Sequence, residues 1–319
     1  MDKAVVLSKQ KGEDTSFARK YGAFIVLLLM IIVNMIITPN FLSMGTLWNI
    51  VIQSCTILLT GMGMTMVVSS GGIDISVGSM MAMGAMCVAK FLPLGIFPAI
   101  VLSLIVCMCL GTFTGFMIAK LKIQPMIMTL AMMMSVRGIA QVMNDAMLLY
   151  ISDSNFSQLG TGRVGGMIPN QLFIIIAVVL FVYFIMKKTT LGQYIQAVGD
   201  NPASARLAGI NTVKTIIIVY VLCAAFAGLA GIIETAKISA ADGNAIGKLA
   251  ELDAIAAVAV GGTSMSGGKA RVFGTVIGAL IMQLITIMVN MNNIPFEVSQ
   301  VIKSIVIIVA VFLQRGKRS

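Results

Sequence analysis

Histidine is absent from this chain of 319 residues. Histidine is the commonest general base, proton carrier and metal ligand in proteins, so its absence disfavours an intramembrane metalloprotease and proton relays built on imidazole. The five cysteines lie within apolar stretches without the spacing of metal ligands, and we expect them to be small packing residues. These absences disfavour an enzyme and a metal site.

Charged residues are also scarce, at 11% of the chain, whereas hydrophobic residues make up 58% and the mean hydropathy is +1.00. This balance is outside that of a soluble globular domain and is typical of an integral membrane protein. The period-two alternation of a β-barrel is missing, so the apolar runs are expected to be helices, which satisfy their own backbone groups in lipid. We therefore predict an all-α, polytopic membrane protein.

Ten apolar runs approach the length needed to cross the bilayer core. The third and eighth are short and adjoin glycine-rich sequence, which leaves open that either is broken or re-entrant. The ten runs are residues 22–38, 47–68, 76–90, 96–119, 125–143, 171–186, 214–235, 252–262 with its continuation, 272–290 and 298–313.

The placement of Lys and Arg tests this count. With the amino terminus inside, sixteen of these cations fall in cytoplasmic segments and four in outer loops, as the positive-inside rule requires. We therefore expect about ten transmembrane helices, both termini in the cytoplasm, and location in the cell inner membrane. The expected divisions are a cytoplasmic segment 1–20, a transmembrane domain 21–313 with a cytoplasmic loop 187–214, and a cytoplasmic tail 314–319. Because no small-residue cleavage site closes the first run, we expect an uncleaved first helix.

The net charge of +10 is explained by this inside bias, since the cations are spread over loop ends and are not clustered with aromatic residues as in a nucleic-acid groove. We expect no nucleic-acid partner. The 26 methionines are mixed with Gly and Ala around helix faces, which favours adaptable packing over a Cu(I) pathway.

A glycine-rich stretch at residues 261–268 precedes Lys269 and superficially suggests a phosphate loop. The spacing of its glycines is wrong, and Ala270 stands where the motif needs Ser or Thr for the metal. We expect that this chain does not hydrolyse ATP. The stretch matches residues 71–78 at four of eight positions, a weak hint of an internal repeat.

Residues 71–78 contain Asp74, the one acid in more than fifty positions. A carboxylate at membrane depth is a candidate functional residue, because its burial must be offset by partners or by water. Asp74 is also well placed to cap the third run by accepting from the N–H groups of Ser76 or Val77. The capping role and a pathway-lining role for Asp74 with Gly72 and Ser76 are compatible, and both stay open.

The cytoplasmic loop contains a capped helix signal. Asn201 is a favoured N-cap, Pro202 suits the first helical position, residues 203–208 are mostly strong helix formers, and Gly209 suits the left-handed C-terminal position. The pattern predicts a helix of about two turns, which is marginal in water alone. We interpret it as an element that docks into a groove of a soluble partner.

Three segments now carry a resemblance: GGIDISVGSMMAMGA (71–85), TTLGQYIQAVGDNPASARLAGI (189–210) and ELDAIAAVAVGGTSMSGGKARVFGTVIGAL (251–280). Together they resemble the permease subunits of bacterial ATP-binding-cassette sugar importers, the ribose-type family related to branched-chain amino-acid permeases. The resemblance covers residues 20–313. The segment from Gly72 to Ser76 favours the sugar branch over the branched-chain amino-acid branch.

The resemblance implies the ABC importer permease fold and a subunit that moves a ribose-like pentose or a hexose inward. It implies that two permease subunits, identical or different, sit on a cytoplasmic ATPase with two fused domains, and that a periplasmic or lipid-anchored sugar-binding protein delivers the sugar. ATP and Mg would be used by the ATPase, with no cofactor bound by this chain. The residues assigned to coupling with the ATPase are Asp200, Asn201, Pro202, Ala203, Arg206, Leu207 and Gly209.

The sugar route is harder to assign, because the chain has one Trp and five Tyr to offer as sugar platforms. Our assigned pathway residues are Asp74, Gly72, Ser76, Gln53, Glu234 and Asp253. Other polar residues in or beside the runs are Asn34, Gln124, Arg137, Asn144, Gln283 and Asn290, and any one of these polar candidates is more often an interhelical hydrogen-bonding group than a ligand. A nucleoside, a polyol or a sugar-like signal stays open as substrate. An ion-coupled secondary transporter is a weaker alternative, because acids are few, and a membrane enzyme or scaffold is weaker still.

Overall fold

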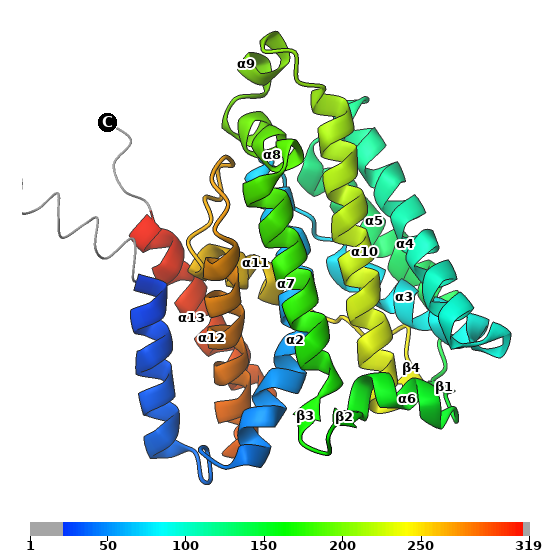
Figure 1. Ribbon diagram of the computed structural model, residues 1–319, viewed down its shortest axis with the longest axis vertical. Coiled ribbons are helices and arrows are strands. Elements are labelled where there is room, and N and C mark those ends of the chain that lie inside the picture. The colour runs from blue at the N-terminus through cyan, green and yellow to red at the C-terminus, as the bar shows by residue number, and fades with distance from the viewer. Residues whose placement is uncertain (1–21, 315–319) are drawn as a thin grey trace, which may run out of the picture.

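The computed structural model describes residues 22–314, and these residues fold mainly as helices (Figure 1). Among them, seven helical segments are long and apolar enough to cross a membrane. They are α2 (Met44–Ser69), α3 with a following 3₁₀ turn (Val77–Leu94), α4 (Ile96–Ala119), α5 (Pro125–Val142), α7 (Asn170–Lys188), α10 (Thr212–Ile238) and α12 (Val272–Met291).

Three further apolar helices account for the rest of the predicted runs. They are Gly22–Ile37, α11 (Ala250–Val260) and α13 (Phe296–Gln314). Each of the ten runs thus coincides with a helix, and the prediction of an all-α polytopic membrane protein is confirmed. At 11 residues, α11 is only about 16 Å long and is too short to span the bilayer core by itself. The ten-span topology stays a prediction.

Short polar elements lie at both ends of the bundle. At one end are α8 (Thr190–Asp200) and α9 (Pro202–Leu207); at the other are α6 (Ser154–Thr161) and two small antiparallel strand pairs (Figure 1). Strand β1 (Leu149–Tyr150) pairs with β4 (Ala240–Ala241), and β2 (Arg163–Val164) pairs with β3 (Ile168–Pro169). The first described helix begins, and α13 ends, toward the α8–α9 end (Figure 1).

The centre of the bundle is α10, which packs against α2, α3 and α4. Small residues allow these helices to approach closely: a Cβ added to Gly84 of α3 would lie 2.8 Å from the Cα of Gly228 in α10. Close approach through small residues is how helices gain packing energy where lipid removes the hydrophobic drive. Four of the five cysteines are buried, as expected, whereas Cys109 is exposed.

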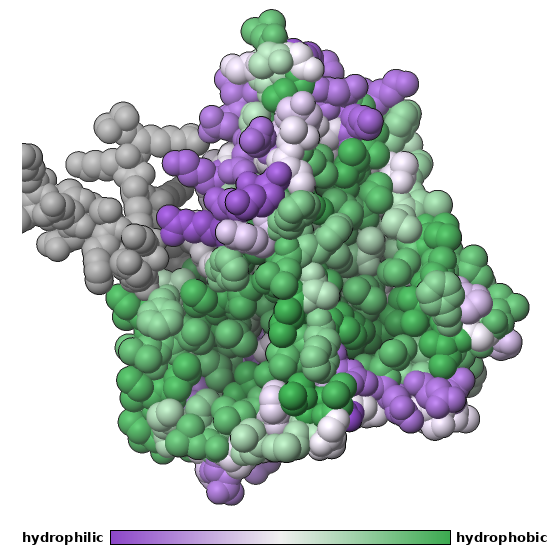
Figure 2. Space-filling view, in the orientation of Figure 1, coloured by the Kyte–Doolittle hydropathy of each residue, from purple (hydrophilic) through white to green (hydrophobic). Residues whose placement is uncertain are grey.

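The surface shows a broad apolar band between two polar ends (Figure 2). Hydrophilic residues gather around α8 and α9 and again near α6, and the side of the bundle between them is apolar. Lipid-facing helices such as α4 and α7 leave large side chains exposed, including Phe97, Phe113, Phe181 and Phe184. This distribution matches a bilayer around the bundle, with α8–α9 in water on one side.

Candidate functional site

A polar cavity of about 360 Å³ lies where α2, α10, α11, α12 and α13 meet. Its lining comes from the middle of α2, the last turns of α10, the segment 242–250, the second half of α12 and the first halves of α11 and α13. Because α10 runs away from α9 toward β4, the cavity lies in the half of the bundle opposite α8–α9 (Figure 1). Its volume is in the range of small-molecule sites.

Three of the assigned pathway residues line this cavity. Gln53 comes from α2, Glu234 from α10 and Asp253 from α11, and the further candidate Gln283 comes from α12. The Nε2 of Gln283 lies 3.5 Å from the Oε1 of Gln53, which joins α12 to α2 across the lining. Four residues far apart in the sequence are thus brought together.

The structure adds lining residues that we did not assign from the sequence. They are Thr56, Thr60, Lys237, Asp242, Lys248, Thr286 and Lys303. Lys303 had a signal, because it is a lone cation within an apolar run and such residues are functional candidates. The threonines had none, because a threonine hydroxyl is common in transmembrane helices and usually bonds its own backbone, as Thr60 does to Thr56 O at 2.9 Å.

Two ion pairs shape the cavity. The ammonium of Lys303 donates to both carboxylate oxygens of Asp253, at 2.8 and 3.0 Å, and joins α13 to α11. Lys237 donates to Glu234 at 2.8 Å within α10. Asp253 lies in the first turn of α11, where the helix dipole favours a carboxylate. The Lys303 side chain is 5% exposed and that of Asp253 is 22% exposed, so the carboxylate is the partner with more access to the cavity.

Arg137 holds the segment that forms the outer wall of the cavity. Its guanidinium donates to the carbonyls of Gly243 at 3.0 Å and Ile246 at 2.6 Å, and to the carbonyl of Gly78 at 3.0 Å. It therefore ties the 242–250 segment to α5 and to the start of α3. Arg137 was a polar candidate in the sequence, and its place in the structure is that of a positioning residue outside the lining.

The chemistry of the lining suits an uncharged polyhydroxylated ligand. The cavity contains three acids (Glu234, Asp242 and Asp253) and three lysines (Lys237, Lys248 and Lys303), so its formal charge is balanced. Carboxylates accept from hydroxyl groups, ammonium groups donate to them, and threonine and glutamine side chains do both. No cluster of three or more His, Cys, Asp or Glu among the residues described could hold a metal ion.

The remaining assigned pathway residues, Gly72, Asp74 and Ser76, lie outside this lining. Asp74 is 2% exposed and accepts from the backbone N–H of Ser76 at 2.9 Å and from its hydroxyl at 2.6 Å. Burial raises the pKa of the Asp74 carboxyl, and the two hydrogen bonds from Ser76 oppose that rise. Asp74 thus accepts the expected hydrogen bond from the N–H of Ser76 in the turn before α3, but the N-cap of α3 is Ser76, so the prediction that Asp74 caps this helix is wrong. Gly72 is closely packed on Tyr220.

The other polar candidates make local contacts outside the lining. Asn34 donates to Met30 O at 2.9 Å, and Asn144 accepts from Lys90 at 3.1 Å. Gln124 precedes the first turn of α5, and Asn290 is an exposed residue near the end of α12. The Asn34 bond lies within one helix, whereas the Lys90–Asn144 bond joins α3 to the segment after α5.

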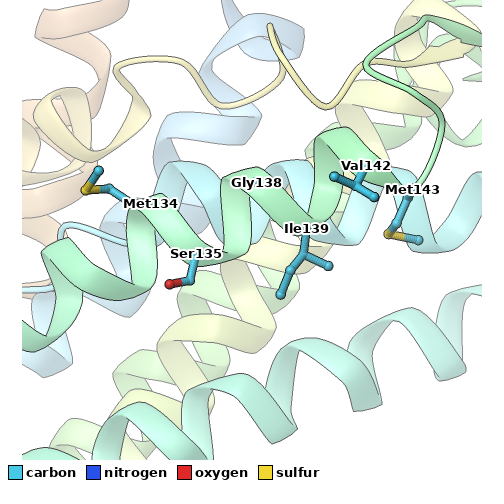
Figure 3. A pocket seen from close by; sticks show the side chains of 6 residues that line it. All are labelled: Met134, Ser135, Gly138, Ile139, Val142 and Met143. Atoms are coloured by element: carbon cyan, nitrogen blue, oxygen red, sulfur yellow. The ribbon is translucent and has the colours of Figure 1, made fainter.

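A second opening follows α5, where Met134, Ser135, Gly138, Ile139, Val142 and Met143 line about 470 Å³ (Figure 3). All of these residues belong to α5 or to its C-cap Met143, and Ser135 is the only one of them with a polar side chain. Such a groove suits a hydrocarbon chain better than a sugar. The polar cavity between α2, α10, α11, α12 and α13 is therefore the candidate ligand site.

The predicted helix of the cytoplasmic loop is confirmed as α9. The Oδ1 of Asn201 accepts from the N–H groups of Ala203 and Ser204, both at 3.0 Å, Pro202 is the first helical residue, and Gly209 has a φ of +82°. Leu207 is 92% exposed, and α9 lies at one tip of the molecule (Figure 1). A single exposed apolar side chain is ordinary on a protein surface, so the docking role of α9 stays a prediction. Residues 190–200, which the sequence analysis predicts to be loop, instead form the amphipathic helix α8.

A polytopic helical bundle with a polar cavity in its apolar core defines a membrane permease. Residues 46–311 match the family described as branched-chain amino acid transport system / permease component, and the chain belongs to this family. The resemblance drawn from three sequence segments is thereby confirmed.

Relatives cover nearly the whole chain. It is 37% identical over 302 residues to the ribose import permease protein of Escherichia coli K12, covering 93% of this chain and 94% of the relative. It is 39% identical over 301 residues to the ribose import permease protein of Haemophilus influenzae, covering 92% and 93%. It is 34% identical over 310 residues to the galactofuranose transporter permease protein of Escherichia coli K12, covering 91% and 88%. No solved structure matches the chain.

Proposed function

We propose that this chain is the permease subunit of an ATP-binding-cassette importer and carries a monosaccharide, a ribose-like pentose or a hexose, inward across the bacterial inner membrane. The observation that carries the proposal is the agreement of two findings. The relatives over more than 90% of the chain are named for sugar import, and the cavity is polar and charge-balanced.

The translocation pathway of the proposal begins at the cavity. With ten spans and both termini in the cytoplasm, α8 and α9 are cytoplasmic and the cavity lies in the outer half of the bundle. A sugar released by a periplasmic or lipid-anchored binding protein enters there and meets Gln53, Glu234 and Asp253. Because the binding protein supplies affinity, the permease needs only a weak site of its own.

The energy comes from a partner. A cytoplasmic ATPase, with two fused domains, hydrolyses ATP with Mg and pushes on α9 through Asp200, Asn201, Pro202, Ala203, Arg206, Leu207 and Gly209. A second permease copy or a paralogue completes the transmembrane unit, and this chain itself binds no cofactor. Coupling of this kind needs a rigid element that can take two positions. The capped helix α9 is the rigid element of the proposal.

The test is the ATPase activity of the permease reconstituted in lipid with its ATPase, with and without binding protein loaded from a panel of sugars, polyols and nucleosides. Stimulation by one loaded monosaccharide is expected and identifies the substrate. Stimulation by a polyol or nucleoside alone overturns the sugar assignment. Uptake driven by an ion gradient in the absence of any ATPase overturns the importer assignment.

A further inference from the structure

The end of α8, the end of α2 and the loop between α11 and α12 meet at five residues, three of them glycines. We call this contact the glycine junction. It consists of Ser69, Gly199, Asp200, Gly267 and Gly268. These residues are up to 199 positions apart in the sequence, yet their backbones touch. In Figure 1 the loop after α11 rises beside α8.

The packing at the junction leaves no room for a side chain at Gly199 or Gly267. A Cβ added to Gly199 would overlap the carbonyl oxygen of Ser69 and lie 2.7 Å from the backbone N of Gly268. A Cβ added to Gly267 would overlap the carbonyl oxygen of Gly199. The N–H of Gly268 donates to the carbonyl of Ser69 at 3.0 Å. Three chain segments are therefore in direct backbone contact, so a displacement of one meets the others without a flexible side chain between them.

Two of the three segments at the junction, α2 and the loop between α11 and α12, continue into helices that line the cavity. Helix α2 ends at Ser69 and carries Gln53, Thr56 and Thr60 in the lining. From Thr60 to Ser69 the helix rises only about 14 Å. The loop of Gly267 and Gly268 follows α11, whose first turns carry Asp253 in the lining.

Between the junction and the cavity, α2 and α11 stay packed together. A Cβ added to Gly61 of α2 would lie 3.9 Å from the Cβ of Ala257 in α11. The hydroxyls of Thr65 in α2 and Thr275 in α12 are 2.7 Å apart and hydrogen-bonded. Continuous contact of this kind lets the two helices move as one body.

On the far side, α8 leads directly into α9. Gly199 and Asp200 are the last two residues of α8, and Asn201 caps α9. Resting on the proposed coupling role of α9, we propose that the glycine junction transmits the displacement of α9 to α2 and α11, and so opens and closes the cavity. Gly199 is the positioning residue of the junction, because only a residue without a side chain lets α8 contact the backbones of Ser69 and Gly268.

The experiment uses the permease assembled with its ATPase in lipid nanodiscs, and it needs no knowledge of the sugar. A reporter, Thr56→Cys, is placed in the cavity lining of a chain whose own cysteines are replaced. Its labelling by a soluble maleimide is followed by mass spectrometry without nucleotide and after trapping with ATP and vanadate. If about 90% of the molecules change between open and closed states, the labelling rate changes by about tenfold.

Two single substitutions in α8 distinguish an effect at the glycine junction from a general effect on the packing of α8. Gly199→Ala is expected to keep ATP hydrolysis and to abolish the nucleotide-dependent change in labelling. Gly192→Ala is the matched control: it lies in the same helix, and its Cβ would overlap the carbonyl oxygen of Ile185 in α7, which contributes nothing to the cavity lining. It is expected to retain the change. An unaltered response in Gly199→Ala, or the same loss in both variants, overturns the proposal.

A cross-link tests the same idea without Gly199→Ala, should that variant fail to assemble. A Cβ at Gly268 would lie 3.8 Å from the Cβ of Asp200, which is the separation that a disulfide requires. In Asp200→Cys/Gly268→Cys the labelling change after oxidation is expected to equal that of the same variant in its reduced form, because the linked parts move together. The reduced variant is the reference, since both substituted positions belong to the coupling region. Loss of the change on oxidation, with recovery on reduction, overturns the proposal. Failure of the unsubstituted permease to assemble with any ATPase counts against the proposed function instead.

Discussion

At the residue scale, the ion pair of Asp253 and Lys303 shows how a membrane site accommodates charge. The pair is bidentate, and it joins two helices at the wall of the cavity. Removing one partner of a buried pair leaves the other uncompensated and is costly, while removing both is often tolerated. Since Lys303 is more deeply buried than Asp253, the two single removals are not equivalent.

We predict that Asp253→Asn lowers the melting temperature of the purified permease more than Lys303→Met does. Asp253→Asn leaves a buried ammonium unpaired, with a cost of about 3–5 kcal/mol, whereas Lys303→Met leaves a carboxylate with access to the cavity. The double variant should recover part of the loss. Equal losses that simply add in the double variant would contradict the pairing.

The Glu234–Lys237 pair provides a milder comparison. Both side chains are about a quarter exposed, at 23% and 24%, and exposed pairs of this kind contribute about 0–1 kcal/mol. Glu234→Gln should therefore leave the melting temperature nearly unchanged. In the proposed function it should still reduce sugar uptake, because the carboxylate faces the cavity. A stable variant with unchanged uptake would remove Glu234 from the pathway.

At the scale of elements, α9 depends on its cap and on the partner that it is proposed to meet. It has six residues, too few to be stable as an isolated helix in water. The two hydrogen bonds to Asn201 satisfy N–H groups of its first turn. Loss of such a cap costs about 1 kcal/mol.

We predict that Asn201→Ala weakens the binding of the ATPase to the permease by roughly fivefold, the equivalent of about 1 kcal/mol. Asn201→Asp and Asn201→Ser retain a capping oxygen and should bind nearly as well as the unsubstituted chain. Titration of the ATPase against permease in nanodiscs measures this. If the alanine and serine variants bind alike, the cap has no part in docking.

Arg206 offers a test of charge in the same helix. Arg206→Glu reverses the sign in the last turn of α9 and should reduce both transport and stimulated ATPase activity. Survival of both activities in a well-expressed variant would count against the docking role of α9. Arg163→Glu, at the other end of the molecule in β2, serves as the matched control and should leave both activities intact.

At the scale of the whole molecule, the two polar ends and the apolar band between them imply an orientation. The positive-inside bias predicts that α8 and α9 lie in the cytoplasm, and on that prediction the cavity in the opposite half faces outward. The ten helices alternate in direction only if α11 and the glycine-rich loop that follows it cross the membrane together as one span.

We predict the sidedness of three exposed positions. Single cysteines at Lys122 and Leu207 should react with an impermeant maleimide only in inside-out vesicles, and one at Arg163 only in intact spheroplasts. All three positions are exposed, so a cysteine that fails to react lies on the side of the membrane that the reagent does not reach. Reaction of Arg163→Cys from the same side as Leu207→Cys would contradict the ten-span topology.

The sequence by itself determined what depends on neighbouring residues. Hydropathy located all ten apolar helices, because a run of apolar residues in lipid has no alternative to helix. The cap of α9 was also determined locally, since Asn201, Pro202 and Gly209 act within one or two turns. The amphipathic helix α8 was missed, because its apolar face is buried only when α7, α10 and α2 are in place.

Tertiary structure alone decided what depends on distant residues. Gln53, Glu234, Asp253 and Lys303 form one cavity, while Asp74 is buried elsewhere beside its own Ser76. Nothing local pairs Asp253 with Lys303, 50 residues further on, or seats Gly199 against Ser69 and Gly268. Hydropathy specifies that a helix forms but not which face meets which neighbour, and only the packing of the whole bundle settles that.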